Sequence, residues 1–335
     1  MNYCLLINNK HYLTYNVNAE KIILAEFNIL NEKYKFAENV QIRDICGLKY
    51  LSYKNINDNI DILDKISELS FVLGIFEQKK ELLKPIAKTN IEFVNNNISS
   101  LLKYSGKTNE YFTKLMINIA ANLIDKNENI NLLDPICGKG TSLYEGLIKG
   151  YNCYGIEIAS KVVEEIFIFL KKFLEKERYK FNSKKQKFSG ENKSFKAEKF
   201  IFEINKNKEN KDFKHFEVVS ANTFFTDKIY KKSFFDIIVG DLPYGVKHSN
   251  ISNEKQSSFT RNPKELLEKS LDSWKNVLNE NGILVISWNT FLLKREDFKN
   301  LLITKGFKVI ENESLLSFEH RVDQAINRDI IVAKK

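Results

Sequence analysis

The chain has 335 residues, a formal charge of +9 at pH 7 and a pI near 9.0. This length suffices for a large α/β domain plus a smaller one, and the basic balance favours a polyanionic partner such as nucleic acid. A general bias toward lysine would explain the same charge, because lysines on solvated faces are common. The four cysteines lack the spacing of familiar zinc sites, so we expect no metal, and they suit a reducing compartment. No apolar run approaches about 18 residues and no signal peptide is visible, so we expect a cytoplasmic protein.

The first eighty residues have a pattern of their own. It predicts strands at residues 2–7, 40–44, 48–53 and 70–77, with helices at 19–30 and 60–69. The order β-α-β-β-α-β is that of a small ferredoxin-like α+β domain. Such a module could guide RNA, or it could be a structural or dimerisation appendage, because a fold alone does not assign function. We therefore divide the chain into this module at 1–80, a connector at 81–103 and a larger domain at 104–335.

A strand, a glycine turn and a helix follow one another in the larger domain. Residues 131–133 are a short apolar run that leads to Asp134, Gly138 and Gly140 follow at a spacing of two, and residues 142–149 have helical periodicity. Glycines let the backbone approach a ligand at the carboxyl end of a strand, where open α/β sheets bind their ligands. The turn lacks the Walker and full dinucleotide fingerprints, so a plain tight turn is the alternative.

The next two strands each deliver a polar residue. Residues 152–158 end at Glu157, about twenty residues beyond the glycine turn, where an acidic side chain can accept hydrogen bonds from both ribose hydroxyls. A solvated Glu at a strand end is the alternative. The strand at 217–220 leads to Asn222, which could contact an adenine edge or could be an ordinary loop asparagine.

The fourth strand, at 235–240, leads to Asp241, Leu242, Pro243, Tyr244 and Gly245. The exocyclic amine of a base is a poor nucleophile, so a site must accept its N–H hydrogens and orient the nitrogen lone pair. The Asp241 carboxylate and the Leu242 carbonyl can do this, while Pro243 stiffens the turn and Tyr244 offers a face for stacking the base. A type I turn with a surface tyrosine is the alternative.

These segments resemble the motifs of class I S-adenosylmethionine-dependent methyltransferases, namely 134–141, 155–157 and 241–245. More narrowly, they resemble the THUMP-associated RNA guanine-N2 methyltransferases, which carry Asp-Pro-x-Cys-Gly-x-Gly-Thr and Asp/Asn-x-Pro-Tyr/Phe-Gly. Residues 105–113 also resemble the segment that helps close the methionine side of the cofactor in this group. The resemblance extends from about residue 104 to the C-terminus. Leu242 departs from DNA adenine-N6 enzymes, which have a second proline there, and this favours RNA.

The resemblance implies an α/β fold with a Rossmann-like, seven-stranded sheet whose last strand is antiparallel, behind the ferredoxin-like module. The cofactor would be S-adenosylmethionine and the partner tRNA or rRNA, methylated at an exocyclic amine, most simply guanine N2. Catalytic positions would be Asp241, Leu242, Pro243 and Tyr244. Cofactor-binding positions would be Thr113, Asp134, Cys137, Gly138, Gly140, Thr141, Glu157, Ile158, Asn222 and Asp241.

Two other classes of function remain open at this point. A DNA adenine-N6 or protein glutamine-N5 methyltransferase would use the same chemistry on another planar amine or amide. A non-catalytic RNA-binding protein could keep a methyltransferase fold. The combination of Asp134, Glu157, Asp241 and Tyr244 argues against the second class, because a dead site has no physical reason to keep four coordinated polar positions.

Two further stretches are unusual. Residues 171–214 hold fifteen Lys/Arg against seven Asp/Glu, with interleaved aromatics at Tyr179, Phe181, Phe188, Phe195 and Phe200. This insertion is expected to interrupt the sheet, either as an RNA-gripping element or as a solvated helix and hairpin. Residues 247–263 are polar and are expected to form a flap whose Lys247, His248 and Arg261 could reach phosphate. The pattern also predicts helices at 110–124 and 264–278 and later strands at 282–288, 306–311 and 329–333.

Overall fold

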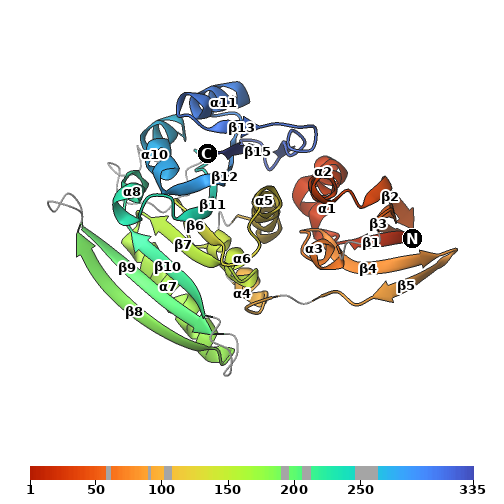
Figure 1. Ribbon diagram of the computed structural model, residues 1–335, viewed down its shortest axis with the longest axis horizontal. Coiled ribbons are helices and arrows are strands. Elements are labelled where there is room, and N and C mark those ends of the chain that lie inside the picture. The colour runs from red at the N-terminus through yellow and green to blue at the C-terminus, as the bar shows by residue number, and fades with distance from the viewer. Residues whose placement is uncertain (58–61, 90–91, 102–107, 190–195, 206–212, 246–262) are drawn as a thin grey trace.

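A computed structural model describes residues 1–57, 62–89, 92–101, 108–189, 196–205, 213–245 and 263–335 (Figure 1). The predicted flap at 247–263, with Lys247, His248 and Arg261, lies outside these described residues except for Pro263, the first residue of a helix, and Phe195 lies outside them too. No helix within the described ranges is long and apolar enough to cross a membrane.

The N-terminal unit is an antiparallel sheet with helices packed on it. Its strands lie in the order β2-β3-β1-β4-β5. The order of elements from β1 to β4 is the predicted one, although α1 was not anticipated and α3 is shorter than expected. The strands are β1 (Asn2–Ile7), β2 (Ala37–Ile45), β3 (Leu48–Asn55), β4 (Val72–Lys79) and β5 (Leu82–Ile86), and the helices are α1 (Lys10–Tyr15), η1 (Asn16–Asn18), α2 (Ala19–Tyr34) and α3 (Leu63–Ser67).

The predicted connector at 81–103 is only partly a connector. Its first residues form β5, which pairs with β4 from Ile75 opposite Ile86 to Lys79 opposite Leu82. Its last described residues form the short helix α4 (Asn97–Leu101). Local signals for this strand are weak, because β5 is a mostly exposed edge strand with Pro85 inside it, and edge strands tolerate proline.

The second unit is built on one mixed sheet. Its described strands lie in the order β13-β15-β12-β11-β6-β7-β10-β9-β8, with β14 paired to β15, so this sheet has ten strands instead of the predicted seven. The neighbouring strands β10, β7, β6, β11 and β12 are parallel to one another. Strand β15 is antiparallel to β12, as expected for the last strand. The strands are β6 (Asn131–Asp134), β7 (Asn152–Glu157), β8 (Lys180–Ser189), β9 (Lys196–Asn205), β10 (Phe213–Ser220), β11 (Phe235–Asp241), β12 (Leu278–Asn289), β13 (Lys308–Ile310), β14 (His320–Arg321) and β15 (Asn327–Lys334).

Helices cover both faces of this sheet, and the central strands are therefore buried on both sides. In β11, Ile237 and Val239 pack into one apolar cluster while Ile238 packs into another. This double burial explains why the central strands are continuous apolar runs. The helices are α5 (Glu110–Leu123), α6 (Thr141–Ile148), α7 (Ser160–Lys176), η3 (Thr223–Phe225), α8 (Thr226–Ile229), α10 (Pro263–Val277) and α11 (Arg295–Thr304).

The basic insertion does not interrupt the sheet but widens it. After α7, strands β8 and β9 form a long antiparallel hairpin, and β9 pairs with the whole length of β10 (Figure 1). Phe200 is buried, and Tyr179 and Phe181 pack against the same apolar cluster. These described aromatic side chains therefore hold the hairpin on the sheet, which is the helix-and-hairpin alternative, and their packing leaves little ring surface for stacking bases.

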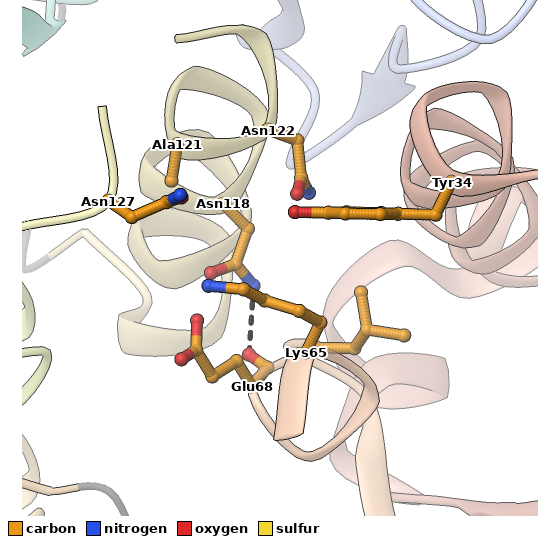
Figure 2. A pocket seen from close by; sticks show the side chains of 8 residues that line it. Tyr34, Lys65, Glu68, Asn118, Ala121, Asn122 and Asn127 are labelled. Atoms are coloured by element: carbon orange, nitrogen blue, oxygen red, sulfur yellow. Dashed lines mark hydrogen bonds between the residues drawn. The ribbon is translucent and has the colours of Figure 1, made fainter. Parts of the chain in front are cut away.

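Buried polar side chains join the two units where α2 and α3 meet α5. The Glu26 carboxylate accepts hydrogen bonds from the Ser70 N–H at 2.9 Å and from the Asn118 amide at 2.8 Å. Asn118 also donates to the Glu68 backbone carbonyl at 2.9 Å, as Figure 2 shows. Lys149 pairs with the Glu68 carboxylate and donates to Asn118 Oδ1 at 3.0 Å. Because these buried groups satisfy one another, they fix how the two units sit together.

A small cavity lies beside this network, lined by Tyr34, Lys65, Asn122 and Asn127 among others (Figure 2). Its volume is about 20 Å³. That is room for roughly one water molecule, so the cavity is not a site for a nucleotide or a base.

Candidate active site

The carboxyl ends of parallel strands meet at one edge of the main sheet. Strand β6 pairs in parallel with β7 and with β11, and β7 pairs in parallel with β10. Asp134, Glu157 and Asp241 are the last residues of their strands, and Asn222 follows β10 by two residues. Since parallel strands end on the same side, the fold brings the four predicted polar residues to one edge, where open α/β sheets bind ligands.

The glycine turn is a tight loop tied to the neighbouring strand. The φ angles are +50° at Gly138 and +83° at Gly140, a region that favours glycine. The Cys137 N–H donates to the Ile156 carbonyl at 2.9 Å, and the Gly140 N–H donates to the Cys137 carbonyl at 2.8 Å. A side chain added at Gly138 would meet nothing within 4 Å, so this stretch of backbone borders open space.

The Asp134 side chain holds this loop in place through hydrogen bonds. Its carboxylate accepts a hydrogen bond from the Ile136 N–H at 3.0 Å and another from the Ser142 hydroxyl at the start of α6. Burial, with smaller contributions from the carboxylates of Asp241 and Glu157, raises the pKa of Asp134 to about 7. Asp134 therefore holds the loop in shape, and the contact with the cofactor that the resemblance implied for it stays a prediction.

Glu157 and Asn222 lie next to each other at the ends of β7 and β10. The Ala221 N–H donates to the Glu157 carbonyl at 3.1 Å. The Glu157 carboxylate accepts from the Ala159 N–H at 2.8 Å, and burial raises its pKa although backbone N–H groups, including that of Gly138, oppose the shift. Asn222 Oδ1 accepts from the Phe224 N–H at 3.0 Å and caps η3. The half-buried Glu157 side chain therefore stands beside the glycine loop, with Asn222 adjacent to it.

Three hydroxyl groups converge on the Asp241 carboxylate. Thr108 Oγ1 donates to Oδ2 at 2.7 Å, and the hydroxyls of Tyr244 and Ser287 both donate to Oδ1. Ser287 lies directly opposite Asp241 on β12. This half-buried carboxylate is held in one orientation by groups from three separate segments.

Leu242 and Pro243 connect the carboxylate to Tyr244. The Leu242 N–H donates to the Ser287 carbonyl at 2.9 Å, and the Leu242 side chain is buried in the apolar cluster that includes Trp274. Pro243 is half-buried, and Gly245 has a φ of +73°. The turn is therefore anchored to β12 instead of lying free on the surface, which argues against the surface-turn alternative.

The Tyr244 ring is more enclosed than the sequence suggested. The Arg328 guanidinium lies over it at 4.9 Å from the ring centroid. Burial and the nearby Asp241 carboxylate raise the pKa of Tyr244 well above its usual range. One face of the ring is thus already occupied, so any stacking of a base would have to use the other face.

Sequence reasoning missed three residues of this site. Thr108 lies in the stretch that had been singled out at 105–113, whose residues 105–107 fall outside the described part of the chain. Ser287 lay inside a predicted strand, and its pairing opposite Asp241 depends on strand order. Arg328 lies just outside the predicted strand at 329–333, and no local signal marks it as buried, because arginines are mostly exposed.

The remaining predicted cofactor residues have varied surroundings. Thr113 is buried in α5 and its hydroxyl donates to the Asn109 carbonyl at 3.2 Å. Thr141 is buried at the start of α6, whereas Ile158 is exposed beyond the end of β7. Burial, reinforced by the Asp134 carboxylate, raises the pKa of Cys137 well above its usual range, so this thiol is neutral and is no nucleophile.

A family model describes the same part of the chain. Residues 109–313, more than half of the sequence, match the UPF0020 family, whose description is RMKL-like methyltransferase domain. The chain belongs to this family. It is accordingly a class I S-adenosylmethionine-dependent methyltransferase. No curated protein matches the chain.

Several solved structures are similar to this methyltransferase at low sequence identity. TrmN from Thermus thermophilus is 12% identical, with 88% of this chain and 59% of TrmN covered and a TM-score of 0.40. A TehB-like SAM-dependent methyltransferase from Corynebacterium glutamicum is 15% identical, with 64% and 87% covered and a TM-score of 0.34. The fibrillarin pre-rRNA processing protein of Methanococcus jannaschii is 13% identical, with 89% and 98% covered and a TM-score of 0.35. The chain thus spans 59% of the length of TrmN.

The residues at the strand ends fit the cofactor of this family, S-adenosylmethionine. The loop at Gly138 borders open space on the side where a ligand would lie, and a left-handed φ lets its backbone be approached without a side chain in the way. The half-buried Glu157 carboxylate beside it is an acceptor suited to ribose hydroxyls. When bound, the cofactor supplies an electrophilic methyl group on a sulfonium sulfur.

Proposed function

We propose that this methyltransferase modifies an exocyclic amine of an RNA base, most simply guanine N2 of tRNA or rRNA. The observation that carries the proposal is the Asp241 carboxylate, which three hydroxyls hold at the same sheet edge as the glycine loop and Glu157. The Asp241 carboxylate and the Leu242 carbonyl can together accept the two N–H hydrogens of a base amine, whereas a hydroxyl substrate offers one hydrogen and a carbon substrate offers none.

On the cofactor side, some residues contact the cofactor and others hold the glycine loop in shape. Glu157 accepts hydrogen bonds from the ribose hydroxyls, and the backbone at Gly138 and Gly140 borders the methionine portion. Asn222 presents its amide NH₂ group to adenine, because its oxygen is already used to cap η3. Asp134 keeps the loop in shape through Ile136 and Ser142.

On the substrate side, the protein orients the amine without forming a covalent bond to it. The Asp241 carboxylate and the Leu242 carbonyl accept the two N–H hydrogens, so the nitrogen lone pair points toward the methyl donor. The amine nitrogen forms the new N–C bond as the S–C bond breaks, and the nitrogen then loses one proton to solvent. Most of the acceleration comes from proximity and orientation, as expected for a transfer between two bound partners.

RNA is favoured over DNA and protein by two features of this chain. Leu242 stands where DNA adenine-N6 enzymes have proline, and the chain has a formal charge of +9. The exposed edge strand β8 also carries lysines such as Lys180 and Lys184 at one border of the sheet. These lysines could contact RNA phosphates, and such binding would weaken as the salt concentration rises.

We further propose that the N-terminal unit is a ferredoxin-like module that presents RNA to the catalytic unit, with β5 added at its edge. The catalytic unit would contain the seven strands β10, β7, β6, β11, β12, β15 and β13, to which β8, β9 and β14 are additions. The buried junction through Glu26, Asn118 and Lys149 would make the module a rigid guide.

The test is incubation of the purified protein with radiolabelled S-adenosylmethionine and, separately, unmodified tRNA, ribosomal RNA, duplex DNA and bulk protein, followed by nucleoside or amino-acid analysis. Label in RNA as N2-methylguanosine supports the proposal. Label in DNA as N6-methyladenine or in protein as methylglutamine overturns the substrate. If the protein binds the cofactor but labels no pool, the assay is repeated with whole-cell RNA from a strain that lacks the protein. Absence of label there too would overturn the catalytic proposal.

A further inference from the structure

We propose that Arg328 is a positioning residue of the methyl-transfer site, which it serves by clamping Tyr244 against Asp241. This inference rests on the proposed function, because it assigns Asp241 and Tyr244 to the substrate amine. It adds a residue that lies about eighty positions from the motif along the chain and that no sequence motif includes.

The geometry around Arg328 is that of a planar cation held between two rings. Its guanidinium carbon lies 4.4 Å from the ring centroid of Phe112 in α5 and 4.9 Å from that of Tyr244. Arg328 is only 6% exposed. The attraction of a guanidinium for an aromatic face is strongest when water is excluded, so this contact restricts where the Tyr244 ring can lie.

The orientation of that ring sets the orientation of the carboxylate. The Tyr244 hydroxyl donates to Asp241 Oδ1, the oxygen that also accepts from Ser287. A change of the Tyr244 χ1 angle, which moves the whole ring, would withdraw the hydroxyl and leave Asp241 oriented by Ser287 and Thr108 alone. Arg328 thus acts on the carboxylate through Tyr244 and does not itself need to touch the substrate.

Charge supports the same arrangement. Burial alone would lower the pKa of Arg328, but the nearby Tyr244 and Asp241 outweigh this effect and raise it. His320, which packs against Phe112 in the same cluster, has its pKa lowered to about 4 by burial, so it is neutral near pH 7. Arg328 therefore supplies the positive charge that balances the Asp241 carboxylate in this enclosed place.

The same cluster receives a side chain from the N-terminal unit. Tyr15 of α1 is buried and meets the His320 ring edge-on at a centroid distance of 5.0 Å, and His320 meets Phe112 at 5.5 Å. The back of the Arg328 clamp is therefore closed by residues of α1, α5 and β14. Such a dry, packed support is what holds a catalytic group within a fraction of an ångström of its working geometry.

The experiment compares Arg328→Met, which keeps the bulk and removes the charge, with Arg328→Lys, which keeps the charge. The first assay measures methyl transfer from labelled S-adenosylmethionine to the RNA pool that the wild-type protein labels. The second measures cofactor affinity by calorimetry. We expect Arg328→Met to lower kcat about 100-fold, because a shift of about 1 Å in a group that orients the substrate can slow a reaction by that factor. The KM for RNA and the Kd for the cofactor should change by less than about threefold. Arg328→Lys should keep only about a tenth of the wild-type kcat, because a lysine ammonium group keeps the charge but cannot stack on aromatic rings.

Arg295→Met is the matched control. Arg295 is a second largely buried arginine that lies over an aromatic ring, Trp288 at 6.0 Å, and it pairs with Asp329, the neighbour of Arg328. Its loss should lower the melting temperature without the selective loss of kcat. Equal losses of kcat in the two Met variants, in step with their melting temperatures, would mean that Arg328 is merely structural.

A second measurement needs no RNA. The ¹³Cζ resonance of Tyr244, assigned by its disappearance in Tyr244→Phe, reports the hydrogen bond to Asp241. It should move or broaden in Arg328→Met and stay in place in Arg295→Met; an unchanged resonance in both overturns the clamp. Asp241→Asn keeps the two hypotheses apart. If it abolishes transfer while Arg328→Met does not, only the clamp is wrong, and if it leaves transfer intact, the proposed role of Asp241 is wrong.

Discussion

Gly155 is the residue at which the packing of the cofactor loop can be tested most directly. It lies in the middle of β7, directly beneath the loop. A β-carbon added at this position would lie 2.6 Å from Leu143 Cδ1 and 2.8 Å from Cys137 Sγ, both below normal contact distance. Both neighbours are buried, so neither can swing into solvent.

The expected cost of Gly155→Ala follows from this overlap. Forcing an extra methyl group into a packed core costs about 1–3 kcal/mol, which corresponds to a fall in melting temperature of about 1–4 °C for a chain of this size. Part of the strain should be relieved by moving Cys137, which belongs to the glycine loop. We therefore expect the affinity for S-adenosylmethionine to fall about tenfold, equivalent to about 1.4 kcal/mol.

Two variants make the measurement specific. Gly47→Ala is the control: it places alanine at a positive φ, +81°, in the N-terminal hairpin with nothing within 4 Å, so it should cost stability through the backbone without changing cofactor affinity. Leu143→Val shortens the side chain that overlaps most and should recover part of the loss when combined with Gly155→Ala. Thermal melts and calorimetric titration with the cofactor are the assays. A Gly155→Ala protein with wild-type melting temperature and affinity would refute the packing argument.

Three further predictions concern buried charges and the proposed site. Since the folded pKa of Asp134, about 7, lies above its unfolded value near 3.9, the stability it contributes is complete below about pH 4 and is lost as the pH rises through 7. Asp134→Asn should therefore gain a few kcal/mol relative to the wild type between pH 4 and 8 in denaturant titrations, and a constant difference across that range would contradict the assignment. Lys149→Met should lower the free energy of unfolding by about 3 kcal/mol, because it leaves the Glu68 carboxylate buried without its cation, and Lys149→Met with Glu68→Gln should recover much of it. Asp241→Ala should abolish methyl transfer while cofactor affinity changes little, whereas Glu157→Ala should weaken cofactor binding about tenfold or more; equal loss of both properties in each variant would remove the proposed division of roles.

The elements of the fold were largely predictable because their signals are local. Continuous apolar runs marked the central strands, and the positive φ that Gly138 and Gly140 require is written in the residue type itself. The insertion was predictable as basic and aromatic, but not as part of the sheet, because pairing of β9 with β10 is a contact between segments that periodicity does not record. The ferredoxin-like interpretation and the domain limits stay predictions.

The sequence by itself determined which residues stand at strand ends and hence that Asp134, Glu157, Asn222 and Asp241 share one edge of the sheet. Only the tertiary structure decided what each side chain does there. It engages Asp134 within its own loop and covers one face of Tyr244 with Arg328, whose partners come from segments more than eighty residues away. The physical reason is that the position of a strand end follows from local pattern, whereas strand pairing and the burial of a charged side chain depend on which distant groups are packed together.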